Sequence, residues 1–253
     1  MAGYDFFASY YEGLMQNVEY EKRCEYLLNI AKQHNHNMGI TLDLACGTGC
    51  LTRELKKSGV DVYGIDSSAE MLSEAMMRTT EAELDILYLR QKMQSIDLYG
   101  TINTCVCTLD SINHLIKPSD VEKTFDRVAL FMDKGGLFIF DVNTIYNHRE
   151  ILANNTFVYE DERVFCVWQN TLEEIDVVKI ELDFFEEENG VYYRSGESFY
   201  ERAYSDDFIR QALEKAGFTV QAVYGDLTYD KPCDTEQRVV YVACMKESRN
   251  KEV

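Results

Sequence analysis

Short apolar runs alternate with amphipathic segments along the first part of the chain. The apolar runs cover residues 40–45, 60–66, 84–90, 102–110 and 137–142, and in the segments between them apolar side chains recur every three or four positions. Strand, helix and strand at intervals of roughly 20 to 40 residues are typical of a parallel sheet covered by helices. The pattern therefore predicts an α/β fold with a doubly wound sheet.

Helix and turn signals agree with this interpretation. An amphipathic helix is expected over residues 17–34, and the Pro-Ser-Asp triplet at residues 118–120 is expected to open another helix with a serine or aspartate cap. The glycine pair at residues 135–136 should end that helix ahead of a buried strand. Ser205 should cap the last helix, and Gly217 should end it.

Between residues 146 and 204 the chain changes to alternating, half-polar strands. The Asn189-Gly190 pair is a strong hairpin signal within this region. We therefore interpret residues 146–204 as an inserted antiparallel β-subdomain, and residues 1–145 together with 205–247 as one domain.

The balance of charged residues narrows the range of partners. The chain of 253 residues has a formal net charge of −19, spread along its length, with no cluster of Lys and Arg. Such a surface repels phosphate backbones, so nucleic acid is not an expected partner. No basic leader precedes an apolar core at the amino terminus, and no apolar stretch reaches the ~18 residues of a membrane helix. We therefore expect a cytoplasmic protein without a membrane partner.

Eight cysteines stand at irregular spacings, without a Cys-x-x-Cys pair. Several lie in apolar runs, and we interpret them as reduced, mostly buried thiols. Cys105 and Cys107 would face one side of a predicted strand, with no further ligands beside them. We therefore expect neither a disulfide framework nor a metal site.

The stretch Leu-Asp-Leu-Ala-Cys-Gly-Thr-Gly places two glycines after an apolar run. Gly47 and Gly49 would let the backbone approach a ligand, and the helix after them would offer free N–H groups to an anion. The dinucleotide fingerprint needs a third glycine that is missing here. Asp43 before the turn would repel a pyrophosphate but suits an ammonium group. Asp66, 23 residues later, could accept the hydroxyls of a ribose, cap a helix, or do both.

These residues together resemble the class I S-adenosylmethionine-dependent methyltransferases. The resemblance implies a Rossmann-like seven-stranded sheet whose last strand is antiparallel, with S-adenosylmethionine as the cofactor. The opening segment and the inserted strands further resemble a bacterial subgroup of small methyltransferases of mostly unassigned substrate. The motifs that carry the resemblance lie at residues 42–72, 102–115, 135–144, 214–218 and 238–246.

The resemblance implies positions around the cofactor. A helical segment at about residues 1–38 would form a lid, although its aromatic residues could equally serve in packing. Relatives usually carry an acid that accepts from the adenine amine, whereas this chain has Lys92, and an ammonium cannot accept a hydrogen bond. Adenine would then be held through the backbone around Met93, through Gln91, or less tightly. The implied cofactor-binding residues are Asp43, Ala45, Gly47, Gly49, Asp66, Ser67, Met71, Met93, Leu109, Asp110, Tyr10 and Tyr20.

Methyl transfer from a sulfonium needs alignment of an acceptor and exclusion of water more than it needs a base. Where an acceptor must lose a proton, Asp110 and His114 are the candidate catalytic residues, although a lone histidine is also a common structural residue. Relatives often have a histidine where this chain has Phe199 or Tyr200. The candidate substrate-binding residues, several of which could instead form a small core or a dimer interface, are Asn143, Trp168, Tyr193, Arg194 and Tyr200.

Three functions follow from this interpretation. The first is methyl transfer to a nitrogen or oxygen atom of a small-molecule acceptor, with the inserted strands covering the acceptor site. The second is methylation of tRNA or protein, for which the acidic surface disfavours RNA. The third is a module that binds the cofactor without catalysis. A monomer and a homodimer both remain open.

Overall fold

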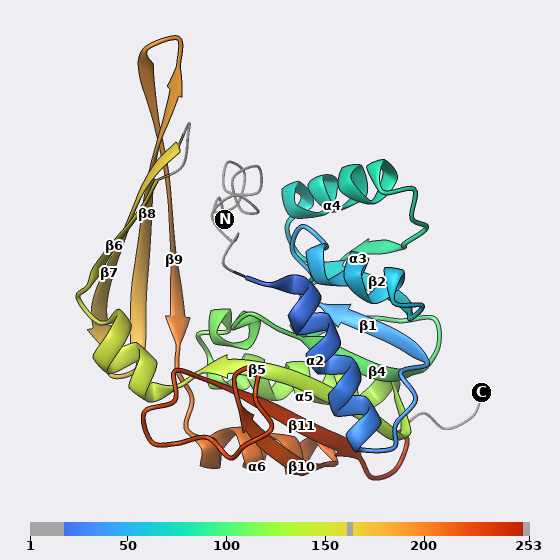
Figure 1. Ribbon diagram of the computed structural model, residues 1–253. Coiled ribbons are helices and arrows are strands. Elements are labelled where there is room, and N and C mark those ends of the chain that lie inside the picture. The colour runs from blue at the N-terminus through green and yellow to red at the C-terminus, as the bar shows by residue number, and fades with distance from the viewer. Residues whose placement is uncertain (1–17, 161–163, 250–253) are drawn as a thin grey trace.

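The computed structural model describes residues 18–160 and 164–249. Its main body is a seven-stranded sheet in the order β10-β11-β5-β4-β1-β2-β3 (Figure 1). The sheet is mixed, because β11 runs antiparallel to both of its neighbours. The strands are β1 (Ile40–Leu44), β2 (Asp61–Asp66), β3 (Tyr88–Arg90), β4 (Ile102–Cys107), β5 (Met132–Asn143), β10 (Phe218–Gly225) and β11 (Arg238–Met245).

This topology confirms the predicted doubly wound sheet with a reversed last strand. β1 lies between β2 and β4 and pairs with both in parallel. Its residues Leu42 and Leu44 are completely buried, as expected for a central strand covered on both faces. Because β1, β2 and β4 are parallel, their carboxyl ends meet at one edge of the sheet, where ligands bind in open α/β folds.

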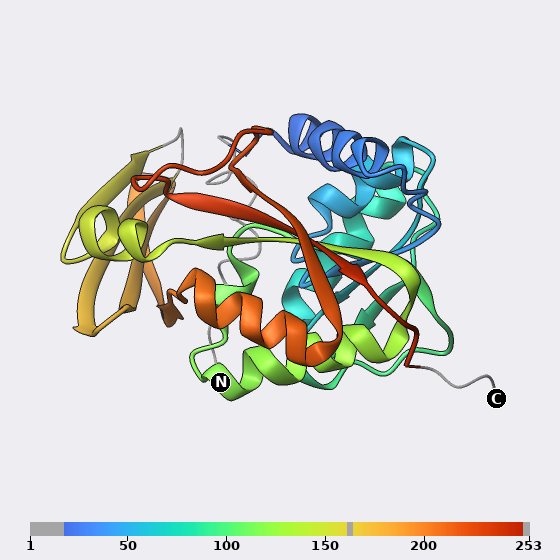
Figure 2. The same cartoon turned by 90° about the horizontal axis from the view of Figure 1, so that it is seen from below.

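Helices cover both faces of the sheet, with α2 and α3 on one face and α5 and α6 on the other (Figure 2). Ser205 accepts a hydrogen bond from the Phe208 N–H, and Gly217 ends α6 in the left-handed conformation, as predicted. The α-helices are α2 (Tyr20–Gln33), α3 (Cys50–Lys57), α4 (Ala69–Glu81), α5 (Pro118–Phe131) and α6 (Asp206–Ala216).

Two predicted boundaries of α5 were wrong. Its N-cap is Lys117, and neither following polar side chain caps it, because Pro118 takes the first turn, where its missing N–H costs nothing. The helix ends at Phe131, and Gly135 and Gly136 lie inside β5. A side chain on Gly136 would clash with Met132 and the Asn103 backbone, so that glycine is required by strand packing.

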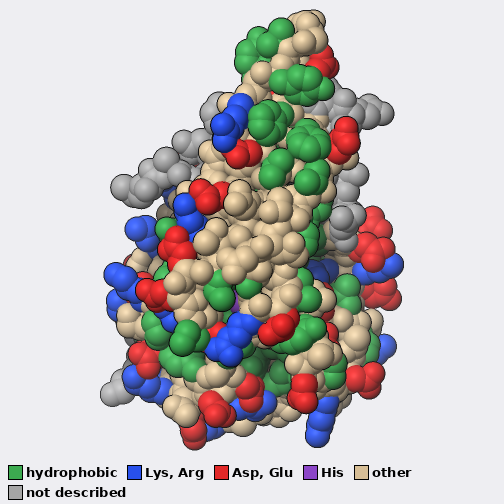
Figure 3. All heavy atoms as spheres, turned by 90° about the vertical axis from the view of Figure 1, so that its left-hand side faces the viewer, with side chains coloured by type: hydrophobic (Ala, Val, Ile, Leu, Met, Phe, Trp, Pro, Cys, Tyr) green, Lys and Arg blue, Asp and Glu red, His purple; other side chains and the backbone are tan. Residues whose placement is uncertain are grey.

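A second sheet, four-stranded and antiparallel, rises from one end of the main body (Figure 1). Asn189 and Gly190, both with positive φ, join its two longest strands, which confirms the hairpin signal. Its buried side chains form a separate core that also contains Met71 of α4. Exposed apolar side chains gather toward the protruding end (Figure 3), where Tyr192 is 66% exposed. The strands are β6 (Thr156–Glu160), β7 (Val164–Glu174), β8 (Val177–Glu188) and β9 (Val191–Arg202).

The described residues also contain three short helical segments, η1 (Met93–Ser95), η2 (Ser111–His114) and η3 (Asn147–Leu152). None of the described helices is long and apolar enough to cross a bilayer. α2 and α5 have only 14 residues each, against the ~20 that a membrane span requires. All eight cysteines are free thiols.

Candidate active site

The turn after β1 uses its glycines for two different purposes. Ala45, Gly47 and Gly49 all have positive φ, which lets the chain fold back tightly before α3. A side chain on Gly49 would lie 2.5 Å from the Tyr88 hydroxyl, so internal packing requires that glycine. A Cβ on Gly47 would meet no protein atom within 4 Å. The backbone is therefore bare toward open space only at Gly47.

Asp66, at the end of β2, is tied to this turn. Its carboxylate accepts the backbone N–H of Gly47 at 2.9 Å and that of Ser68 at 2.9 Å. The cap of α4 is Ser68, whose hydroxyl accepts the Met71 N–H, so the interpretation of Asp66 as the cap was wrong. Burial raises the pKa of Asp66, although its backbone hydrogen bonds oppose that shift.

Asp43 lies beneath the same turn and is only 2% exposed. Its carboxylate accepts a 2.6 Å hydrogen bond from the Thr52 hydroxyl. Burial, with a smaller contribution from the negative charge of Asp66, raises the pKa of Asp43 to about 7. A cation bound beside Asp43 and Asp66 would be stabilised and would lower both pKa values.

The turn opens into a cavity of about 630 Å³, lined by the carboxyl edge of the main sheet and by the second sheet. This volume is typical of a site for a small organic ligand. The cavity brings together most of the predicted residues, namely Tyr20, Asp43, Ala45, Gly47, Asp66, Ser67, Met71, Met93, Leu109, Asp110, His114, Trp168 and Tyr200.

Several predicted residues lie elsewhere. Gly49 and Asn143 are not among the described residues that line the cavity, and Tyr10 lies outside the residues that the structure describes. Tyr193 and Arg194 stand on the protruding part of β9, where Tyr193 is 56% exposed and Arg194 pairs with Asp183 instead of facing the cavity. The sequence did not indicate that β9 begins far from the cavity, so the distance of these two residues from it could not be predicted.

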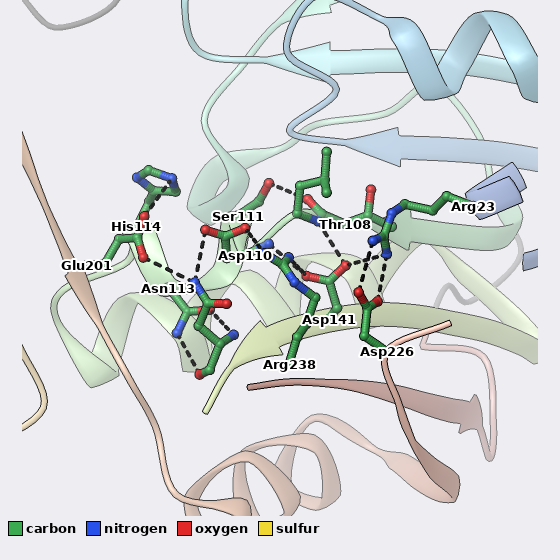
Figure 4. Close-up of polar contacts among 12 residues, drawn as sticks. Arg23, Thr108, Asp110, Ser111, Asn113, His114, Asp141, Glu201, Asp226 and Arg238 are labelled. Atoms are coloured by element: carbon green, nitrogen blue, oxygen red, sulfur yellow. Dashed lines mark hydrogen bonds and ion pairs between the residues drawn. The ribbon is translucent and has the colours of Figure 1, made fainter. Parts of the chain in front are cut away.

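Beyond β4, the chain bends through two consecutive residues with positive φ, Leu109 and Asp110. This conformation is unfavourable for residues other than glycine. The carboxylate of Asp141 on β5 holds the bend by accepting both N–H groups, at 2.9 Å from Leu109 and 2.7 Å from Asp110. Asp110, which lines the cavity, is thereby held beside Asp141 and Arg238 (Figure 4).

Arg238, at the start of β11, joins the two carboxylates. Its guanidinium donates to Asp141 at 2.7 Å and to Asp110 at 2.7 Å (Figure 4). Burial alone would raise the pKa of Asp110, but the positive charge of Arg238 outweighs it and holds the pKa below its usual value. Arg23 extends the network, pairing with Asp226 at 3.0 Å and lying 3.6 Å from Asp141.

A second carboxylate, that of Glu201 on β9, lies beside Asp110. Asn143 donates to Asp110 at 3.1 Å and to Glu201 at 3.4 Å, although it is not itself among the described residues that line the cavity. His114 and His148 each place a ring nitrogen 3.7 Å from a Glu201 oxygen. Burial, followed by the charge of Asp110, raises the pKa of Glu201 well above its ordinary value.

Arg238, Asp141 and Glu201 were not predicted from the sequence. Asp141 had a detectable signal, since an acid at the end of an apolar strand is placed at the ligand edge of a parallel sheet. Arg238 and Glu201 reach the site from distant segments, and nothing near them in the sequence marks that contact. Lys92 is exposed and outside the described lining, whereas its neighbour Met93 faces the cavity.

Comparisons with known proteins place this chain in a family. Residues 41–136 match the family model described as a methyltransferase domain. A relative from Geobacillus sp. (strain WCH70), named "Putative methyltransferase", is 31% identical over 95% of this chain and 98% of its own length. The structure of an S-adenosylmethionine-dependent methyltransferase from Clostridium acetobutylicum ATCC 824 is 31% identical, with a TM-score of 0.88, and covers 96% of this chain and 98% of that one.

A third protein is similar in fold alone. The sugar N-methyltransferase KedS8 from Streptoalloteichus sp. ATCC 53650 is 18% identical, with a TM-score of 0.77, over 98% of this chain and 95% of that one. The identity and coverage of the first two proteins, together with the glycine turn and its flanking carboxylates, establish the family. The chain belongs to the class I S-adenosylmethionine-dependent methyltransferases.

Proposed function

We propose that this protein transfers a methyl group from S-adenosylmethionine to a nitrogen or oxygen atom of a small-molecule acceptor. The observation that carries the proposal is the bare backbone at Gly47, which opens into the cavity between the buried carboxylates of Asp43 and Asp66. These residues fit the cofactor because Asp43 suits its ammonium group and Asp66 keeps lone pairs for ribose hydroxyls. Met71 and Met93 would pack against the nucleoside.

The cofactor supplies a methyl group on a sulfonium, and the remaining work belongs to the chain. The second sheet closes one side of the cavity with Trp168, Phe199 and Tyr200, which would exclude water and orient the acceptor. Asp110 and His114 line the same cavity, with the His114 ring 5.2 Å from the Phe199 ring, and either could accept a proton from the acceptor. Tyr20 also lines the cavity, which supports a role for the leading segment as a lid.

The size of the cavity, about 630 Å³, favours a small acceptor over a macromolecule. The sugar N-methyltransferase among the structural relatives is consistent with a compact substrate. The charge of −19 disfavours RNA, and a protein acceptor would have to insert a side chain beside the second sheet. A module that only binds the cofactor is the remaining alternative.

Calorimetry with S-adenosylmethionine and S-adenosylhomocysteine, followed by transfer of a tritiated methyl group, tests the proposal. The full-length protein would be incubated with separate metabolite, tRNA and protein pools. We expect label in the metabolite pool. Label only in tRNA or protein would replace the proposed acceptor class, and binding without transfer to any pool would favour the silent module.

Replacing Asp66 with alanine should weaken S-adenosylhomocysteine binding by about 1 to 3 kcal/mol, because the ribose hydroxyls lose their acceptor. Calorimetry at about pH 7.5, above the pKa of about 7 of Asp43, would measure the change. Asp61→Ala, at the exposed start of the same strand, is the matched control and should bind normally. Equal affinities of the two variants would contradict the proposed place of the ribose.

Acidification should weaken cofactor binding. The pKa of Asp43 is about 7 in the free protein, and an ammonium group favours the ionised carboxylate, so binding must displace a proton as the pH falls. Affinity for S-adenosylhomocysteine should drop by about tenfold per pH unit below pH ~7 and level off above it. The Asp43→Asn variant should bind weakly with little dependence on pH in this range. A flat profile for the unmodified protein would contradict the role of Asp43.

A further inference from the structure

Two carboxylates remain in the cavity after the cofactor positions are assigned. Asp110 and Glu201 each offer an oxygen, and with a nitrogen of His114 these atoms all lie within 4.8 Å of one another. The negative charge of Asp110 is balanced by its ion pair with Arg238. Glu201 is only 3% exposed, and beside its oxygens lie the Asn143 amide, the imidazoles of His114 and His148, and the Asp110 carboxyl, to which it hydrogen-bonds.

Neither histidine supplies a compensating charge at neutral pH. Burial lowers the pKa of His148 to about 4, and burial also lowers the pKa of His114 despite the nearby carboxylates. Both rings are therefore neutral near pH 7. Burial and the neighbouring Asp110 carboxylate therefore favour the protonated form of Glu201 in the free protein, and a positively charged ligand beside the two carboxyl groups would favour its ionised form.

The charges of the other residues that line the cavity also restrict which acceptors can bind. No Lys or Arg is present among the described residues that line the cavity, whereas four acids are. An acceptor that carried a carboxylate or a phosphate would have no charged partner there. The wall beside Glu201 is instead apolar and aromatic, formed by Tyr159, Cys166, Trp168, Leu182, Phe199 and Tyr200.

We propose that the acceptor is a cationic amine on an apolar or aromatic body without an anionic group, and that Glu201 takes the proton from its ammonium. This inference rests on the proposed methyl transfer. Asp110 and Glu201 receive the ammonium N–H groups, and the aromatic wall, in particular Trp168, holds the body of the acceptor and adds a cation–π attraction. Glu201 is thereby a catalytic residue that touches the substrate.

The reaction balances with these groups. One N–H bond of the ammonium breaks as an O–H bond forms on Glu201, and the electron pair stays on nitrogen. The nitrogen then forms a bond to the methyl carbon while the carbon–sulfur bond breaks, with its electron pair remaining on sulfur. The product is a methylated ammonium, and the proton on Glu201 returns to solvent before the next turnover.

Three acceptors that share a phenethyl unit test the charge requirement. Phenethylamine carries only an ammonium, phenethyl alcohol is neutral, and phenylalanine adds a carboxylate. In calorimetry with the full-length protein saturated by S-adenosylhomocysteine, phenethylamine should bind at least about tenfold more tightly than the other two, a difference of about 1.4 kcal/mol. With tritiated S-adenosylmethionine, it should be the one labelled, at nitrogen.

Preference for the alcohol or the amino acid would overturn the inference, as would failure of all three to bind a protein that does bind S-adenosylhomocysteine. A protein that does not bind S-adenosylhomocysteine would overturn the proposed function itself. The two failures are therefore distinguishable in the same calorimeter. Labelling that disappears with a chelator and returns with Mn²⁺ or Mg²⁺ would also overturn the inference, since a divalent cation would then occupy the same three ligands.

The Glu201→Gln variant tests the proton transfer separately. Its kcat/KM for phenethylamine should be about 100-fold lower at pH 7 and should rise by about tenfold per pH unit, because only amine that is already neutral can react. Affinity for S-adenosylhomocysteine should be unchanged. Glu181→Gln, on the neighbouring strand and paired with Lys179, is the control and should behave as the unmodified protein. A parallel pH profile for Glu201→Gln and the unmodified protein would overturn the role of Glu201.

Discussion

The Arg238→Met variant is expected to lose about 3 kcal/mol of stability, because it leaves two buried carboxylates without their shared cation. Arg238 holds Asp110 and Asp141 at 2.7 Å each, and the Asp141 side chain is only 1% exposed. Methionine fills a similar volume, so the loss is electrostatic and not a cavity effect. For a chain of this length, the melting temperature should fall by about 6 to 12 °C.

Differential scanning calorimetry at pH 7 measures this change, and the pH dependence identifies its cause. In the unmodified protein the pKa of Asp110 is lower than in the unfolded chain, where it is about 3.9. The ion pair of Asp110 with Arg238 therefore stabilises the fold fully above that pH, and this stabilisation is lost as the pH falls through the lower pKa of the folded state. In the variant, burial raises that pKa. Acidification to about pH 5 should therefore narrow the difference between the two proteins.

Arg194→Met is the matched control for this comparison. Arg194 also pairs with an aspartate at 2.8 Å, but its side chain is 66% exposed, and its loss should cost less than about 0.5 kcal/mol. Adding Asp110→Asn to Arg238→Met should recover part of the lost stability, since one stranded charge is removed. Equal melting temperatures for Arg238→Met and Arg194→Met would show that the network does not stabilise the fold.

Local sequence signals were sufficient to predict the fold and one half of the site. The turn containing Gly47, the acid before it and Asp66 at the next strand end lie within about 25 residues, and parallel topology brings successive strand ends together. The hairpin at Asn189 was likewise predictable because the turn chemistry is local. This half of the site is formed by the backbone conformation of the turn and by the order of the strands.

The other half depends on contacts that no local pattern specifies. Arg238 reaches Asp110 across 128 residues of sequence, and Glu201 approaches Asp110 because β9 packs beside η2. Charged residues at these positions are indistinguishable in sequence from the many solvated acids and bases of the chain. For the same reason the sequence did not indicate that Arg194 lies outside the described cavity lining and pairs with Asp183.

Replacing Gly47 with valine is expected to weaken S-adenosylhomocysteine binding by more than about 100-fold, equivalent to about 2.7 kcal/mol. The added side chain would enter the cavity, since no protein atom lies within 4 Å of the Cβ position. Valine at a φ of +54° also strains the backbone and would disturb the N–H that Asp66 accepts. Calorimetric titration gives the affinity, and thermal unfolding gives the cost of the strain.

Gly59→Val separates these two effects. Gly59 has a φ of +84° and equally open space around it, but it lies at the end of α3, outside the described lining of the cavity. Both variants should lose about 1 to 3 kcal/mol of stability from backbone strain. Only Gly47→Val should lose the ligand, because only there does the side chain enter the space that we propose for the methionine moiety. If a folded Gly47→Val protein bound S-adenosylhomocysteine as tightly as Gly59→Val, the bare backbone would have no part in cofactor recognition, and the cavity would have to hold the cofactor by its other walls.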